Sequence, residues 1–317
     1  MPDKKDLISV IVPCYNESEA LPFFYREIAT VAKTIDAELE IICVDDGSSD
    51  DTLEKLRILS ANDKRIHYIS FSRNFGKEAA MYAGLCAAKG DYVAIMDADL
   101  QDPPSLLPEM YGTLKTEDYD SVATRRRTRD GEPKLRSFCA RAFYKLMNRI
   151  SKTELVEGAR DFRLMNRRMV DAIVSMSEYN RFTKGIFCWV GFRTKWLEYD
   201  NIERVAGKTK WSFWKLFKYS LECIYNFSTV PLDISSFTGF TLCFAAIIGI
   251  IVIIIRSLCG APATSGWAST LCVILFVGGL QLFCIGILGK YLSRTYLETK
   301  RRPIFIVRET DEDNKEQ

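Results

Sequence analysis

Short apolar runs alternate with helix-like segments along the first 125 residues of the chain. The apolar runs predict five strands, at residues 7–15, 38–46, 65–72, 91–99 and 119–125. Four segments with helical patterns separate these strands. They lie at residues 18–35, 52 to about 61, 76–90 and 105–116, and residues 48–51 offer capping side chains for the second of them. Strands and helices that alternate in this way pack as a mostly parallel sheet with helices on both faces. The pattern therefore predicts an α/β fold.

The pattern is less regular between residues 125 and 210. Residues 125–136 are strongly basic, and helical spacing begins after Pro133. A further helix follows residues 158–168, and residues 184–199 have a strand-like pattern. We expect residues 1–210 to form a single domain.

Two long windows without any charged residue follow this domain, at residues 234–255 and 257–289. Each window can hold the run of about 20 apolar residues that spans the hydrocarbon core of a bilayer. Core helices of soluble proteins seldom lack a polar face over such a length. We therefore predict transmembrane helices at 233–258 and 266–289 rather than buried core helices.

Basic residues flank the two predicted spans and are scarce between them. They are Lys208, Lys210, Lys215 and Lys218 before the first span, and Lys290, Arg294, Lys300, Arg301 and Arg302 after the second. The connecting loop, residues 256–266, contains one arginine. By the positive-inside rule, both ends of the chain are cytosolic and the loop faces outward. The N-terminus has no long apolar run, so we expect no secretory signal.

The segments that adjoin the spans have their own patterns. In residues 211–232, apolar side chains recur at helical spacing with lysines elsewhere on the wheel, at Phe213, Leu216, Phe217, Leu221 and Ile224. This predicts an amphipathic helix in the membrane interface, with a helix packed on the sheet as the alternative. Residues 290–317 are expected to be a cytosolic tail whose acidic end, 309–317, is disordered. Most arginines of 125–136 are expected to face solvent or anionic lipid.

Composition narrows the possible chemistry. Ten cysteines are scattered singly without a CxxC pair, so a zinc site with that spacing is not expected and free thiols are. The only histidine, His67, lies in a predicted strand, which excludes a multi-histidine metal site and makes a Ser-His-Asp triad unexpected. The net charge of +2 argues neither for nor against nucleic acid, and we expect no nucleic-acid partner.

Carboxylates gather where three predicted strands end, in "PCYNE", "VDDGSSD" and "MDADLQD". In parallel α/β sheets ligands bind beyond the carboxyl ends of the strands, so Asp45, Asp46, Asp97 and Asp99 are expected in one crevice. Neighbouring carboxylates repel each other unless a cation lies between them, and Mg²⁺ or Mn²⁺ prefers oxygen ligands completed by substrate phosphates. A D-x-D triplet alone also occurs in surface loops. Neither GxGxxG nor GxxxxGK[ST] is present.

Six motifs in this order, however, resemble one family: "SVIVPCYNE", "VDDGSSDDT", "SRNFGKEAA", "MDADLQDPP", "GARDFRLMNR" and "RVAGKTKWSFWKL". They are similar to the family 2 glycosyltransferases, which have a GT-A (Rossmann-like) fold. The last two motifs, together with the paired spans, resemble its polyprenyl-phosphate branch, which includes bactoprenol glucosyl transferases and, more distantly, dolichol-phosphate mannose synthase. The resemblance covers roughly residues 6–300.

The resemblance implies a role for particular residues. Pro13, Tyr15 and Glu17 would line the nucleotide pocket, and Asp45 or Asp46 would contact uracil and ribose. Asp97 and Asp99 would form the metal-binding D-x-D, with Asp99 in direct contact with Mg²⁺ or Mn²⁺ and Gln101 beside the metal and the sugar. Asp161 would be a base or would position the acceptor. Phosphates of donor and acceptor would meet the cations Arg204, Lys208 and Lys210.

The implied reaction is transfer of a hexose, glucose by preference, from a UDP-sugar to undecaprenyl phosphate, with inversion and release of UDP. A lipid phosphate has a second pKa of about 6 and needs little help to lose its proton, so a positioning role for Asp161 is as strong an expectation as a base. UDP-GlcNAc or GDP-mannose as donor, or a non-catalytic nucleotide-sugar-binding membrane protein, are the alternatives. The protein would belong to the bacterial cytoplasmic (inner) membrane and serve the cell envelope. Some relatives form tetramers, and the oligomeric state stays open.

Overall fold

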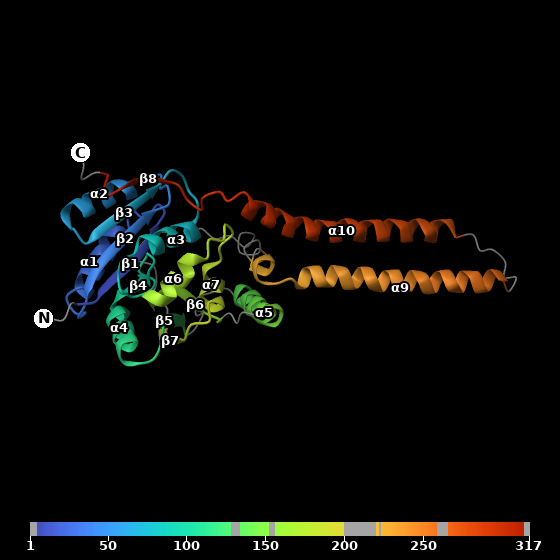
Figure 1. Ribbon diagram of the computed structural model, residues 1–317, viewed down its shortest axis with the longest axis horizontal. Coiled ribbons are helices and arrows are strands. Elements are labelled where there is room, and N and C mark those ends of the chain that lie inside the picture. The colour runs from blue at the N-terminus through green and yellow to red at the C-terminus, as the bar shows by residue number, and fades with distance from the viewer. Residues whose placement is uncertain are drawn as a thin grey trace.

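The computed structural model of the protein describes residues 5–127, 134–151, 156–199, 220–221, 223–258 and 266–313. It consists of an α/β domain at one end and two long helices that project from it side by side (Figure 1). The chain leaves the α/β domain for the helix pair and then returns to it, because the last described strand belongs to the same sheet as the first.

The described strands form one eight-stranded sheet in the order β7-β5-β6-β4-β1-β2-β3-β8. They are β1 (Leu7–Cys14), β2 (Glu38–Asp45), β3 (Ile66–Phe71), β4 (Tyr92–Ile95), β5 (Ser121–Arg126), β6 (Ala159–Asn166), β7 (Thr194–Tyr199) and β8 (Val307–Thr310). The pairs β1–β2, β1–β4, β2–β3 and β5–β7 are parallel. The pairs β4–β6, β5–β6 and β3–β8 are antiparallel. The predicted α/β class and mostly parallel sheet are therefore confirmed.

Helices cover both faces of this sheet. Those of the domain are α1 (Leu21–Val31), α2 (Thr52–Asn62), α3 (Lys77–Ala87), η1 (Pro104–Leu106), α4 (Leu107–Thr116), α5 (Lys134–Ile150), α6 (Arg167–Ser175) and α7 (Thr183–Trp189). Buried side chains of α1, α2 and α4 pack on one face, and those of α3, α6 and α7 pack on the other.

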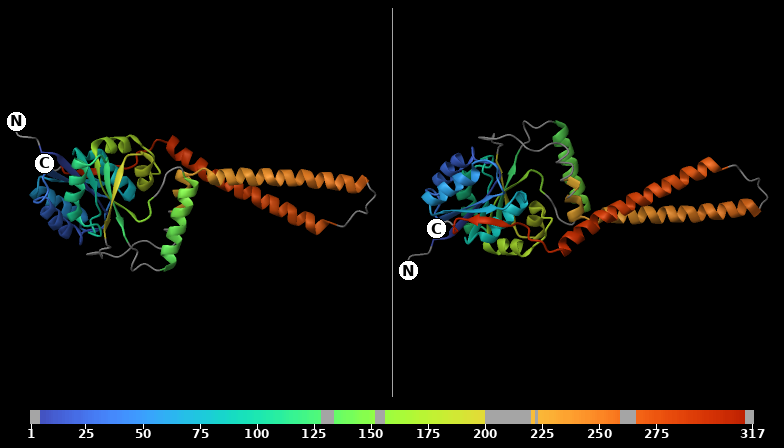
Figure 2. Two further views of the ribbon diagram at one scale, coloured as in Figure 1. Left: turned by 90° about the horizontal axis from the view of Figure 1, so that it is seen from below. Right: turned by 90° about the horizontal axis from the view of Figure 1, so that it is seen from above.

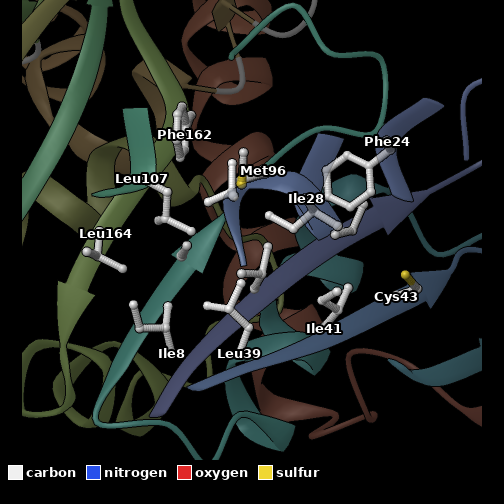
Figure 3. Packing of buried hydrophobic residues seen from close by; sticks show 14 of the residues in the cluster. Ile8, Phe24, Ile28, Leu39, Ile41, Cys43, Met96, Leu107, Phe162 and Leu164 are labelled. Carbon is white, nitrogen blue, oxygen red and sulfur yellow. The ribbon is translucent and has the colours of Figure 1, made fainter. Parts of the chain in front are cut away.

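The central strands are apolar on both sides because both faces of the sheet are covered. Along β1, Ile8 and Val10 belong to the core on the α1 side, whereas Ile11 belongs to the core on the α3 side. Figure 3 shows the first of these cores, in which the side chains of Phe24 and Ile28 from α1 meet those of the strands. Strands buried in this way have nearly continuous apolar sequences, which is why β1 to β4 were recognisable in the sequence.

Two parts of the sheet differ from the sequence-based expectation. Residues 158–168 were not assigned a strand, yet they contain β6, which lies between β4 and β5. Residues 184–199, expected to be strand-like throughout, form nearly all of α7 and then β7. Both segments contain charged or bulky side chains among their apolar residues, so neither shows the alternating or continuous apolar pattern of a strand.

Residues 309–313 of the acidic end form the end of strand β8 and the turn after it, so the expectation of disorder is wrong for these residues. Strand β8 pairs with the edge of β3, and Phe305 stacks on Phe71 with ring centroids 5.0 Å apart. Asp311 Oδ2 lies 2.9 Å from His67 Nδ1. The single histidine thus has a structural role, as expected: it holds the returning strand against the sheet.

The two projecting helices are α9 (Val230–Leu258) and α10 (Trp267–Thr299). Within them, Val230–Ile253 and Thr270–Thr299 are long and apolar enough to cross a membrane. Large apolar side chains such as Phe240, Ile253 and Phe276 are exposed along their length. Apolar surface of this extent marks a membrane or protein contact, which indicates that the protein is membrane-associated. Helix α10 continues ten residues beyond the predicted end at 289.

Most of the predicted interface helix, residues 211–219 and 222, lies outside the described residues. Its end, residues 223–227, is helical and packs on the domain. Cys223 is buried with Met147 of α5, and the ring of Phe227 lies 5.6 Å from that of Phe182 just before α7. Figures 1 and 2 show α5 beside the start of α9 in each view.

Candidate active site

The turns that follow β1 and β2 are tied together. Asn16, with a φ of 54°, donates its backbone N–H to Ser48 Oγ (2.9 Å) and accepts from Ser49 N–H at its side-chain oxygen (2.8 Å). Asparagine tolerates this left-handed conformation better than most residues. The Glu17 N–H donates to Thr52 Oγ1 (2.9 Å) at the start of α2. The motifs "PCYNE" and "VDDGSSDDT" therefore form one continuous surface.

Three predicted nucleotide-pocket residues lie on this surface. Pro13 is half-buried within β1, Tyr15 is exposed directly after the strand, and Glu17 is half-buried. Gly47, with a φ of 65°, lets the loop after β3 approach closely, because a Cβ there would lie 2.5 Å from the Arg73 carbonyl carbon. A side chain at residue 47 would push the two loops apart.

Asp45 and Asp46 are buried beneath this surface and bind protein groups. Asp45 accepts hydrogen bonds from Ser48 N–H (3.0 Å) and Ser70 Oγ (2.8 Å). The carboxylate of Asp46 accepts from the backbone N–H groups of Phe75 (2.6 Å) and Gly76 (2.9 Å), just before α3 begins. Burial raises the pKa of Asp46 to about 6, against the lowering effect of these two N–H donors.

Strand pairing brings the D-x-D segment to Asp161. The antiparallel register of β4 and β6 pairs Tyr92 with Asn166 and Ile95 with Arg163. Continued by two residues, the same register places Asp97 opposite Asp161. Two carboxylates that are 64 positions apart in the sequence thus meet at the carboxyl end of β4.

Lys77, the first residue of α3, joins these two carboxylates. Its Nζ lies 2.7 Å from Asp97 Oδ1 and 2.5 Å from Asp161 Oδ2. Lys184 of α7 approaches Asp161 Oδ1 from another side, at 3.7 Å, and donates to the Ala159 carbonyl (3.0 Å). Asp46, directly after β2, accepts hydrogen bonds from the two residues before Lys77. The end of β2 therefore helps to position the Lys77 ammonium group.

The charges of this cluster hold each other ionised. Burial alone would raise the pKa of Asp161, but Lys77 and Lys184 outweigh it and hold that pKa well below its usual range. Burial alone would lower the pKa of Lys77, but Asp161 and Asp97 outweigh it and raise that pKa above its usual value. Asp161 is therefore a carboxylate, and Lys77 a cation, throughout the neutral range.

The middle of the D-x-D segment turns toward β5 and β6. Leu100 has a φ of 57°, and the Gln101 N–H donates to Asp99 Oδ1 (3.2 Å). Gln101 Oε1 in turn accepts from Arg126 (3.3 Å) and Arg160 (3.4 Å). Asp97, Asp99 and Gln101 thus lie on one loop, and the side-chain oxygens of Asp97 and Gln101 face cationic neighbours.

A third carboxylate, Asp102, anchors the other end of this loop. It is 1% exposed, lies 2.9 Å from Arg160 Nε through Oδ1, and accepts a hydrogen bond from the Tyr199 hydroxyl. Its other oxygen has no hydrogen-bond partner among the described residues. Because Arg160 precedes Asp161 and Tyr199 ends β7, Asp102 ties the D-x-D loop to both strands.

The donor atoms of this loop fit a divalent cation. Asp97, Asp99 and Gln101 offer oxygen atoms, which Mg²⁺ and Mn²⁺ prefer. In the described part of the chain, no three His, Cys, Asp or Glu side chains gather closely enough to enclose a metal ion. Mg²⁺ is usually held by one or two carboxylates together with substrate phosphates. The residues therefore suit an ion that is shared with a diphosphate.

The structure thus brings together most of the predicted site and adds cations that the sequence did not reveal. Arg204, Lys208 and Lys210 lie outside the described residues. Lys77, Lys184 and Arg160 were not singled out. For Lys77 a signal was available, since it lies in the motif "SRNFGKEAA", but its two carboxylate partners are 20 and 84 residues away.

Comparison with known proteins identifies the family of this α/β domain. Residues 9–174 match the glycosyl transferase family 2. The chain is 41% identical over 301 residues to the prophage bactoprenol glucosyl transferase homolog of Escherichia coli (strain K12), covering 95% of this chain and 98% of that one. It is also 41% identical over 308 residues to the SfII prophage-derived bactoprenol glucosyl transferase of Shigella flexneri, covering 97% and 99%.

This protein belongs to glycosyl transferase family 2 and is a glycosyltransferase. Solved structures with a related arrangement are more distant. Mannosyl-3-phosphoglycerate synthase from Rubrobacter xylanophilus is 17% identical, with a TM-score of 0.47 over 69% of this chain and 72% of that chain. Glucosyl-3-phosphoglycerate synthase from Mycobacterium tuberculosis, in complex with Mn²⁺, uridine diphosphate and phosphoglyceric acid, is 19% identical, with a TM-score of 0.46 over 69% and 76%.

Proposed function

We propose that this protein transfers a hexose, with glucose as the first candidate, from a UDP-sugar to a polyprenyl phosphate at the cytosolic face of a bacterial cytoplasmic membrane. The observation that carries the proposal is the cluster of Asp97, Lys77 and Asp161 in a domain joined to two apolar helices. The names of the bactoprenol glucosyl transferases similar to this chain support the lipid acceptor and the glucosyl group.

In this reaction a phosphate oxygen of the acceptor attacks the anomeric carbon as the bond to the nucleoside diphosphate breaks, in one displacement that inverts the configuration. The acceptor phosphate, with a second pKa of about 6, is largely dianionic at neutral pH. It therefore needs no strong base. Asp161, whose pKa is held well below the usual range, is a weak base.

We assign Asp161 a positioning role on these grounds. Its carboxylate holds Lys77 and Lys184 at the mouth of the site. Both ammonium groups can approach phosphate oxygens and stabilise the charge that develops on the departing diphosphate. A divalent cation bound by Asp99 together with the diphosphate would supply further stabilisation of that charge.

The buried carboxylates Asp45 and Asp46 serve to shape the donor pocket. Their partners are protein groups of the surrounding loops, so they would act on the nucleotide through the loops they hold. The exposed ring of Tyr15 is the better placed of the predicted residues for contact with the base or ribose.

The two apolar helices support a lipid as the acceptor. A polyprenyl chain stays in the bilayer, and only its phosphate needs to reach the site. Basic residues at the outer flanks of the helix pair favour a cytosolic position of the domain by the positive-inside rule. A domain tethered at this level searches for its acceptor in two dimensions.

The central test is a transfer assay with the purified full chain, undecaprenyl phosphate and Mg²⁺ or Mn²⁺, using labelled UDP-glucose, UDP-GlcNAc and GDP-mannose in parallel. We expect label from UDP-glucose in the organic phase, and none after addition of EDTA. Label from another donor would change the sugar in the proposal, and label from none would support a protein that only binds nucleotide-sugars.

The role of Asp99 is tested by Asp99→Asn. We expect lipid-linked sugar to disappear while the protein still inserts into membranes, because the variant keeps the shape of the side chain and loses its charge. Asp36→Asn is the matched control, since that carboxylate is 90% exposed just before β2, at the opposite end of the parallel strands from the D-x-D loop. Product at the wild-type rate from Asp99→Asn would contradict the assignment.

A further inference from the structure

A cavity of about 70 Å³ lies between the sheet and α5, next to the cluster of Lys77 and Asp161. Its walls come from α5, β6, α7 and β7. They include the aromatic side chains of Phe143, Tyr144, Phe182 and Trp196 and two cations, Arg163 and Lys184. None of its described lining residues is acidic, the Asp161 carboxylate lies 3.7 Å from Lys184 at its border, and the rest of its surface is largely apolar.

Arg163 is the unusual member of this lining. Its side chain is 3% exposed, and its Nε has no hydrogen-bond partner among the described residues. The guanidinium lies 3.7 Å from the centre of the Phe187 ring and 5.9 Å from that of Trp196. Burial lowers the pKa of Arg163 to about 10, so the group is still a cation at neutral pH. A buried cation without an ion-pair partner is costly unless an anion joins it.

The cavity is connected to the reacting groups and to the membrane helices. Lys184 lines it and is also 3.7 Å from Asp161. On the opposite side, Ser228 at the foot of α9 donates to the carbonyl of Ile150 at the end of α5 (2.9 Å). Three aromatic residues of its walls, Phe143, Tyr144 and Phe182, pack in one apolar cluster with Ile224 and Phe227, so the cavity lies beside the segment that leads into α9. Figure 2 shows α5 beside the base of the helix pair.

We propose that this cavity binds the phosphate head group of the lipid acceptor. The phosphate lies between Arg163 and Lys184, and the first carbons of the isoprenoid chain lie against the aromatic walls. This inference rests on the proposed function for the identity of the lipid. Arginine and lysine both pair with phosphate, and arginine does so in a fixed fork geometry. At about 10–15 Å³ for each water, the cavity holds several waters, which a phosphate group can replace.

The chain offers a matched control in Arg181. It is also buried (7% exposed), it stacks over a ring (Tyr82, 4.1 Å), and its Nε likewise has no partner among the described residues. Its guanidinium donates to the carbonyls of Met176 and Ile173, and it does not line the cavity. Arg181→Leu thus removes a buried, stacked arginine without touching the proposed site.

The first experiment measures binding without transfer. Farnesyl phosphate, farnesol and inorganic phosphate are titrated by calorimetry into the detergent-solubilised full chain in the absence of a sugar donor. We expect farnesyl phosphate to bind more tightly than either farnesol or inorganic phosphate. We expect Arg163→Leu to weaken it at least tenfold, Arg163→Lys and Lys184→Met to weaken it less, and Arg181→Leu to leave it within twofold. Equal losses for the two Leu variants, or none for Arg163→Leu, would overturn the inference.

The second experiment separates this inference from the proposed function. In the transfer assay we expect Arg163→Leu to raise the KM for undecaprenyl phosphate at least tenfold and Arg163→Lys to raise it less, and we expect both to leave the KM for the UDP-sugar unchanged. An unchanged acceptor KM with active enzyme would overturn the cavity assignment alone. Binding of farnesyl phosphate that depends on Arg163, in a wild-type protein that transfers no sugar, would support the cavity and contradict the transferase proposal. Should Arg163→Leu fail to fold, Arg163→Lys and Lys184→Met still decide the outcome.

Discussion

The loop of residues 97–102 has an acid–base cluster at each end, and the two clusters differ in character. At its start, Asp97 and Asp161 share Lys77, whose side chain is 42% exposed. At its end, Asp102 is buried with Arg160 and Tyr199. Partly exposed ion pairs exchange partners with water and ligands at lower cost than fully buried pairs, which are costly to break. The open cluster is therefore suited to meet phosphates, and the closed cluster to hold the loop in place while it does so.

The largest effect is expected from breaking the closed cluster with Asp102→Ala. Removal of one partner of a buried ion pair leaves the other charge unpaired, which typically costs about 3–5 kcal/mol. For a domain of this size that is a fall in melting temperature of roughly 10 °C. Thermal unfolding in detergent measures it.

Asp118→Ala is the control for this variant, because Asp118 forms an exposed pair with Arg193. We expect it to change the stability by less than about 0.5 kcal/mol. Equal melting temperatures for the two variants would mean that the closed cluster does not hold the loop.

The next effect is expected from Lys77→Met, which keeps the length of the side chain and removes the charge of the open cluster. If Lys77 stabilises the departing diphosphate, kcat falls about 10²–10³-fold, which corresponds to about 2.7–4 kcal/mol. The melting temperature is expected to change far less than in Asp102→Ala. Lys115→Met, which removes an exposed partner of Asp6, is the control and should retain its rate. A wild-type rate in Lys77→Met would remove the distinction between the two clusters.

A smaller, pH-dependent effect is expected from Asp46→Asn, which tests the support beneath Lys77. The folded state raises the pKa of Asp46 to about 6 from an ordinary value near 3.8, so folding favours its protonated form. That contribution is fully present below about pH 4 and is lost as the pH rises through 6. Relative to wild type, Asp46→Asn should therefore be more stable at pH 8 than at pH 4, by up to about 3 kcal/mol.

The control for this prediction has the opposite sign. Arg65 lowers the pKa of Asp63 to about 2, so its ionised form stabilises the fold and that stability is lost only as the pH falls through 2. Asp63→Asn should therefore be less stable than wild type at both pH 4 and pH 8. A pH-independent difference for Asp46→Asn would show that the buried carboxyl is not the cause.

The sequence predicted the secondary structure correctly where burial alone determines which residues are apolar. Strands β1 to β4 are apolar on both sides and were recognisable without any knowledge of their neighbours. Strand β6 contains Arg160, Asp161 and Arg163, whose charges are accommodated only once Asp102, Lys77 and Phe187, in that order, lie against them. Strand β8 is short and polar, and it is a strand because the edge of β3 is available to it.

The same distinction applies to the site. The D-x-D loop and the polar ends of β1 and β2 are local patterns and were predicted together. Lys77 and Lys184 belong to the site through the packing of α3 and α7 on the sheet, which no local pattern encodes. Strands β1 to β5 could thus be assigned from the sequence, whereas β6, β8 and the bounds of β7 required coordinates.

The return of β8 to the sheet also constrains how the chain can lie in a bilayer. Residues on either side of the helix pair complete one folded unit, β1 to β7 before it and β8 after it. They can do so only within a single compartment. If α9 enters the bilayer, α10 must bring the chain back across, whatever the distribution of charge, and a variant forced to leave its last residues on the far side would expose an unpaired edge at β3.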